Sequence, residues 1–151
     1  MSKSAFIASR VHALFFGPNW TETSLSELIQ NHTFAEFSNA KVGTKSAAAV
    51  LFHIHYYQRA QLSVLQGGPL NAKDSESFYH PSWKRESDWF QFGSEIIDTG
   101  TELEAAIAQL PESIWSEPFV KAEYGSYETN LAGMLEHSYY HFGQLRRALK
   151  N

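Results

Sequence analysis

Residues 126–149 read SYETNLAGMLEHSYYHFGQLRRAL, and their apolar positions repeat at the spacing of an α-helix. One stripe, at intervals of three or four residues, holds Leu131, Leu135, Ser138, Phe142, Leu145 and Leu149. Such a stripe is typical of a helix that packs one face against other helices. The stretch therefore predicts a long amphipathic helix over residues 126–149.

Three further segments also predict long helices. Residues 4–16 have helical spacing and are followed by Gly17-Pro18, a pair that ends a helix. Residues 45–66 follow Thr44, which can cap a helix, and precede Gly67-Gly68-Pro69. Residues 86–110 form the third segment, with a seam of Trp89, Gly93, Ile96, Gly100, Leu103, Ile107 and Leu110.

Two short helices are predicted between the first and second long segments. Ser24 with Glu27 and Thr33 with Glu36 each have the spacing of a capping box. The alternation of a β-strand is found nowhere in the chain, and residues 67–83 have the composition of a long connection. We therefore expect a single all-α domain over residues 1–151, a four-helix bundle whose long link permits a crossover connection.

Composition excludes several classes of protein. The net charge of -4 and the scattered lysines and arginines provide no basic stripe for nucleic acid. No apolar run approaches the roughly 20 residues that cross a bilayer, and the first residues lack the features of a signal peptide, so we expect a cytoplasmic protein. The chain has no cysteine. Any metal must then be bound by nitrogen and oxygen.

His137 and His141 stand four residues apart and lie on the same side of the predicted final helix. Two imidazoles at this spacing can bind one divalent ion, with nitrogens about 2.0–2.1 Å from a zinc. Ser138, rather than a glutamate, follows His137. The glutamate of the helical metallopeptidase motif is therefore missing, and a peptidase of that kind is disfavoured.

A third ligand would come from the second long helix, which carries His53 and His55. Residues two apart on a helix diverge by about 200°, so only one of them can face the pair. Small and aromatic neighbours favour His53, whereas His55 has Arg59 four residues later, a cation unsuited to the side of a metal. The histidines can also be hydrogen-bonded residues at the edge of a core, and spacing alone leaves both interpretations open.

Two segments resemble the DinB-like superfamily, also described as DinB/YfiT-like metalloenzymes. TKSAAAVLFHIHYYQRAQLSVLQGGP, residues 44–69, is similar to that family's second helix, and EHSYYHFGQL, residues 136–145, to its fourth. The resemblance implies a divalent metal, zinc or nickel, bound by His53, His137 and His141. His55 departs from the family pattern, because it is a second histidine beside the expected ligand and leaves an exchange of roles open.

The resemblance also implies an activity, a metal-dependent hydrolase or a thiol-dependent transferase acting on a small molecule such as a low-molecular-weight thiol. Gln144, one turn after His141, can position a bound water or substrate, or can be a polar residue at the edge of the bundle. The alternative function is a non-catalytic bundle, in which the histidines are structural or a metal only ties two helices together.

The remaining histidines and the outer aromatic residues complete the sequence-based interpretation. His12, His32 and His80 fall on an exposed face, in a turn and in the long connection, and we assign them no role. Phe15, Phe16 and Phe52 are expected at outer positions of their helices, which, together with the habit of many relatives, predicts a homodimer that associates through helix faces.

Overall fold

A computed structural model describes residues 1–150, which are mostly helical. Six α-helices are present among these residues, together with one small hairpin and three short 3-10 turns. The helices are α1 Lys3–Phe16, α2 Leu25–Gln30, α3 Phe34–Asn39, α4 Ala47–Leu65, α5 Glu86–Ala108 and α6 Tyr127–Leu149. The hairpin strands are β1 Lys41–Val42 and β2 Lys45–Ser46, and the turns are η1 Asp74–Glu76, η2 Glu112–Ser116 and η3 Ala122–Tyr124.

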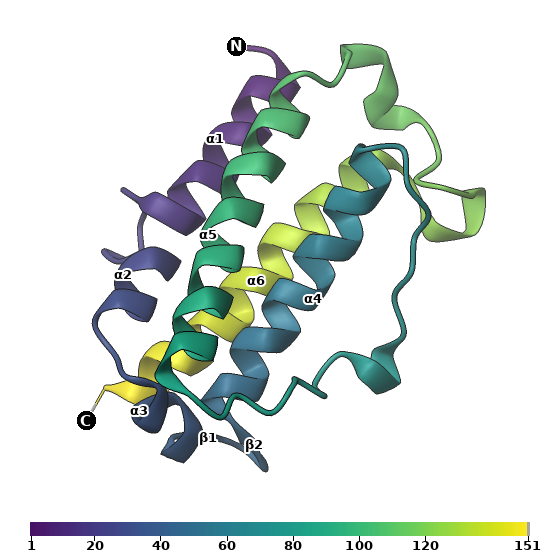
Figure 1. The fold of residues 1–151 in the computed structure, drawn as a ribbon. Helices are drawn as coiled ribbons and strands as arrows, with labels where there is room; N and C mark the ends of the chain where they lie inside the picture. Colours follow the sequence, from purple (N-terminus) through teal and green to yellow (C-terminus); the bar gives the residue numbers. More distant parts are fainter. Residues whose placement is uncertain (151) are drawn as a thin grey trace.

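The four long helices contact one another in a closed ring. Helix α1 packs on α5, α5 on α4, α4 on α6, and α6 on α1. Figure 1 shows α1 and α6 running in one direction and α4 and α5 in the other. The connection between α4 and α5 therefore returns along the outside of the helices to the end where α4 began. This path brings residues 66–85 alongside α4, where Ser77 and Phe78 contact His53.

The apolar stripes predicted from the sequence face the interior. Every position of the α6 stripe is buried, including Ser138, and so is every position of the α5 seam except the half-buried Leu110. The largest side chains with almost no exposure come from every long helix and from the segments that join them: Leu14, Phe15, Leu25, Phe37, Leu51, Ile54, Ile96, Leu103, Ile107, Phe119, Leu131 and Phe142. Burial of this apolar surface is the main stabilising contribution to the fold.

Both short capped helices form as predicted. In α2 the Ser24 hydroxyl accepts from Glu27 N, and the Glu27 carboxylate accepts from Ser24 N. Thr33 and Glu36 make the same reciprocal bonds at the beginning of α3. These bonds satisfy backbone N–H groups that a helix leaves without partners at its first turn.

The beginning of α4 differs from the prediction. Thr44 does not cap the helix, because Lys45 and Ser46 pair with Val42 and Lys41 in the small hairpin that the sequence pattern did not reveal. The helix starts two residues later, at Ala47, and the Ser46 hydroxyl accepts from Ala49 N. Two-residue strands are too short to display alternation, so periodicity could not predict them.

Phe15 also differs from the prediction, because it is fully buried rather than on an outer face. Its ring lies over Gly100 of α5, where an added Cβ would come within 2.4 Å of the Phe15 ring. The residue therefore offers no surface to a second copy of the chain. Phe16 and Phe52 are half-buried against the core. None of the helices in residues 1–150 has the length and apolar character that a membrane crossing needs.

We predict that Gly100→Ala lowers the free energy of unfolding by about 1–3 kcal/mol, because the new methyl group overlaps the Phe15 ring. Urea unfolding followed by circular dichroism measures the change. The matched control is Gly143→Ala on exposed α6 surface, where nothing lies within 4 Å of the added Cβ. That variant should be neutral or more stable by up to about 1 kcal/mol. Equal effects of both substitutions would contradict the close contact.

Candidate metal centre

Three histidines from two helices converge between α4 and α6. His53 lies on α4, and His137 and His141 lie one turn apart on α6. One ring nitrogen from each can be chosen so that all three lie within 4.8 Å of one another. Among the described residues, this is the group of histidine and acidic side chains whose geometry can hold a metal ion.

A buried polar contact aligns the two helices at this point. Gln58 of α4 donates from Nε2 to the Ser138 hydroxyl of α6 at 3.2 Å, and both side chains are almost completely buried. A slip of one helix along the other would leave these groups without partners, at a cost of about 1–3 kcal/mol. Because Ser138 follows His137 directly, the contact also helps to keep His137 beside His53 along the helix axes.

His53 is held by the connection between α4 and α5. Its Nδ1 lies 2.9 Å from the Ser77 hydroxyl oxygen, and that hydroxyl in turn donates to the Asp74 carbonyl. Since the single hydroxyl proton is used on Asp74, Ser77 must accept from His53 Nδ1–H. The Phe78 ring stacks on the imidazole, with centroids 3.9 Å apart and planes inclined by 3°. The lone pair of His53 therefore lies on Nε2, toward α6.

His141 is oriented by its own helix. Its Nδ1 lies 2.8 Å from Gln144 Oε1, an atom that can only accept, so Nδ1 carries the proton and Nε2 carries the lone pair. Gln144 Nε2 then donates to the Tyr140 hydroxyl at 3.3 Å. Such support of a ring nitrogen is typical of histidines that bind metals. Gln144 thus contacts a candidate ligand, and its part in the site is to position His141.

The spacing of the ring nitrogens fits a shared cation. His53 Nε2 and His137 Nε2 face each other at 3.0 Å, an arrangement satisfied by one N–H···N bond or by an ion between them. Two nitrogens bound to a tetrahedral zinc are about 3.3 Å apart, so only a small movement separates the two arrangements. The donor set, three neutral imidazoles with two of them supported from behind, also suits a divalent transition metal.

Burial favours the neutral form of His53 and His137, the form in which histidine binds metals. Desolvation lowers the pKa of His53 to about 4, helped by His137 and His141, while the Asp74 carboxylate opposes the change. Desolvation likewise lowers the pKa of His137, with a contribution from His141. Protonation of one ring would place a cation against its neighbours.

His55 does not join the cluster. It is buried on another side of α4, with its ring edge-to-face on Phe92 of α5 at 5.5 Å. Desolvation lowers its pKa to about 4, and the nearby Arg59 acts in the same direction. The structure therefore brings His53 rather than His55 to the α6 pair. The other histidines lie elsewhere, where His12 pairs with Glu104, His32 bonds the Leu28 carbonyl and His80 stacks on Trp83.

A cleft of about 380 Å³ opens beside the cluster. Two of the histidines, His53 and His137, form part of its wall, and the remaining lining residues are Tyr57, Gln61, Asp74, Thr129, Asn130, Gly133 and Met134. Tyr57 donates its hydroxyl to the Asp74 carboxylate. Burial and this bond raise the pKa of Tyr57 to about 12, so the phenol keeps its proton. Small molecules can thus approach the histidines from one side.

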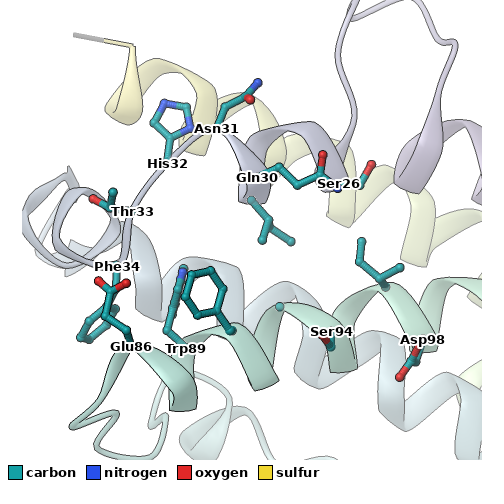
Figure 2. A pocket seen from close by; sticks show the side chains of 14 residues that line it. Ser26, Gln30, Asn31, His32, Thr33, Phe34, Glu86, Trp89, Ser94 and Asp98 are labelled. Carbon is teal, nitrogen blue, oxygen red and sulfur yellow. The ribbon is translucent and has the colours of Figure 1, made fainter.

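A separate hollow of about 500 Å³ lies between α2 and α5. Figure 2 shows Gln30, Asn31 and His32 on one side of it and Glu86, Trp89 and Ser94 on the other. None of the three clustered histidines lines this hollow. It is therefore distinct from the candidate metal centre, and we assign the chemistry to the smaller cleft.

Sequence reasoning missed the residues of the connection that support the site. Asp74, Ser77 and Phe78 lie in a segment without periodicity, so no pattern linked them to His53. One signal was present, a serine and a phenylalanine next to each other in the link. Comparisons of the chain with protein-family models, curated proteins and solved structures find no match. The site therefore rests on its geometry.

We predict that Ser77→Ala weakens divalent-metal affinity about tenfold or more, because His53 loses the partner that fixes its ring. Competition titration with a chromophoric chelator measures the affinity. Ser75→Ala is the matched control, an exposed serine of the same turn. An unchanged affinity in Ser77→Ala would show that the bond does not orient His53.

A second prediction concerns pH in chelator-treated protein. His53 and His55 take up protons near pH 6.5 when unfolded, but only near pH 4 when folded. Between these values the unfolded state binds more protons, so stability falls as pH falls from about 6.5 to about 4. Urea unfolding at successive pH values measures this slope. His53→Asn should make it shallower by about one proton, and an identical slope would contradict the lowered pKa.

Proposed function

We propose that the protein is a metal-dependent enzyme acting on a small molecule, a hydrolase or a thiol-dependent transferase, with a divalent ion held by His53, His137 and His141. The observation that carries the proposal is the convergence of three imidazoles beside a cleft, two of them oriented by hydrogen bonds to their second nitrogen. Three protein ligands leave a tetrahedral ion one position for water or substrate, whereas a structural site is closed by four.

A DinB/YfiT-like four-helix bundle with a crossover is part of the same proposal. The parallel direction of the neighbouring helices α4 and α5, joined by a connection along the outside, supports this arrangement. The two segments that resemble the family are also those that carry the three histidines. Zinc and nickel both suit a site made of imidazoles alone.

The chemistry follows from the charge of the donor set. Three neutral imidazoles leave a bound ion with its full double charge, which lowers the pKa of a bound water or holds a thiol as thiolate. The chain has no cysteine, so the nucleophile is a water or an external thiol. His53 and His141 are kept in the right tautomer by Ser77 and Gln144, and the cleft orients the substrate.

A non-catalytic bundle is the second candidate function. The contact between His53 Nε2 and His137 Nε2 has the length of an ordinary hydrogen bond, and Phe78 packs flat on His53. These contacts are sufficient for a structural cluster that stabilises the pairing of α4 with α6. Metal content and an open coordination position distinguish this function from the first.

We predict about one divalent ion per chain in protein purified without a histidine tag or chelator, measured by elemental analysis. Alanine at His53, His137 or His141 should abolish metal retention, since two imidazoles make a weak site. His55→Ala is the control and should retain the ion, because His55 faces Phe92. Circular dichroism verifies that each variant is folded. Absence of metal after dialysis against zinc and nickel would favour the structural cluster.

A further inference from the structure

The cleft beside the histidines has one formal charge, and it is negative. Asp74 lines the cleft, and none of its nine described lining residues is a lysine or an arginine. The nearest basic residue along the chain, Lys73, turns its ammonium to Glu76 at 3.4 Å. The wall of the cleft therefore offers no basic side chain to pair with an anionic substrate.

One hydrogen bond holds the Asp74 carboxylate, and a second holds the Asp74 backbone. Tyr57 donates its hydroxyl to one carboxylate oxygen, and the Asp74 carbonyl accepts from Ser77. Tyr57 itself packs edge-to-face on both imidazoles, with ring centroids 5.1 Å from His53 and 5.3 Å from His137. The carboxylate is thus held next to the metal ligands, with its second oxygen left to accept from a substrate.

The opposite wall adds a further acceptor. Asn130 donates both protons of its amide nitrogen to the Tyr124 and Ser126 carbonyls, at 2.7 and 2.9 Å. These two bonds determine the orientation of the amide, so Oδ1 remains available as an acceptor. A substrate in this cleft therefore finds acceptors on both α6 and the connection, the complement of a group rich in N–H donors.

Gly133 keeps the cleft open. It lies one turn before His137, in the interior of α6, where glycine weakens a helix relative to alanine. Nothing lies within 4 Å of a Cβ added there, so close packing does not require the glycine. Because Gly133 lines the cleft, an added side chain would occupy substrate space.

We propose that the cleft selects small cationic substrates. In such a substrate a short chain joins an ammonium group, which Asp74 binds, to the atom that binds the metal. Among thiols this means an aminothiol rather than a thiol that bears a carboxylate. The inference rests on the proposed metal-dependent function, and it names the substrate class of that site. It assigns Asp74 to substrate binding and Tyr57 to positioning the carboxylate.

Thiolate binding to the Co²⁺-loaded protein tests the inference. A thiolate on Co²⁺ produces a charge-transfer absorption, so dissociation constants are measured without any assumed reaction. The probes are cysteamine, 2-mercaptoethanol and 3-mercaptopropionate, which differ chiefly in charge. Cysteamine should bind about fivefold more tightly than 2-mercaptoethanol, a difference expected for one partly exposed ion pair. The carboxylate-bearing thiol should bind most weakly.

Asp74→Asn is the decisive variant. The Tyr57 hydroxyl can still donate to the new amide oxygen, and the bond from Ser77 uses the backbone carbonyl, so the support of His53 remains. Chelation of Co²⁺ by an amine acts equally in both proteins, so the change in the cysteamine preference isolates the carboxylate. The variant should retain Co²⁺, and its preference for cysteamine over 2-mercaptoethanol should be about fivefold smaller than that of the unaltered protein.

The outcomes separate the two proposals. A wild-type protein that retains no Co²⁺ overturns the proposed function, and the substrate class with it. A protein that retains Co²⁺ but binds the three thiols equally, or binds none of them, overturns the substrate class alone. A cysteamine preference that is undiminished in Asp74→Asn also overturns it, because the whole preference then has another origin.

Discussion

The close pairing of α4 with α6 is the constraint on which the candidate centre depends. Imidazoles from different helices contact one another only if the helices are neighbours and their axial positions bring the histidines side by side. Apolar burial supplies most of the attraction between the helices. The buried hydrogen bond from Gln58 to Ser138 restricts the position of α4 along α6, because a shifted pairing would leave two polar groups without partners.

Burial has opposite consequences for the fold and for the site. For apolar side chains, exclusion of water stabilises the helices, whereas for His53 and His137 it disfavours the protonated ring. The same desolvation that would make an isolated histidine unfavourable in the core therefore prepares the cluster for a cation. Hydrogen bonds from behind, to Ser77 and Gln144, satisfy the second nitrogen of two rings and reduce the cost of placing them there.

Much of the fold could be predicted because its signals are local. The α6 stripe and the α5 seam are helical patterns within single segments, and both capping boxes join residues three apart. The convergence of His137 with His141 follows from the same periodicity. The choice of His53 over His55 was favoured by neighbouring residues, but it depended on how α4 is rotated. Ser77 and Phe78 could not be found, because they meet His53 across a link without any repeating pattern.

The residues around the cleft come from two kinds of structure, the long helices and the connection between α4 and α5. The candidate ligands lie on helices whose apolar faces tolerate little change, whereas Asp74, Ser77 and Phe78 lie on a segment with largely exposed neighbours. Substitutions at the exposed positions of that segment, such as Asp74, can alter the cleft without disturbing the helix core. Mutation and selection can therefore reshape the cleft along residues 66–85 while the three clustered histidines stay unchanged, so under the proposed function related proteins could differ in substrate and share one metal centre.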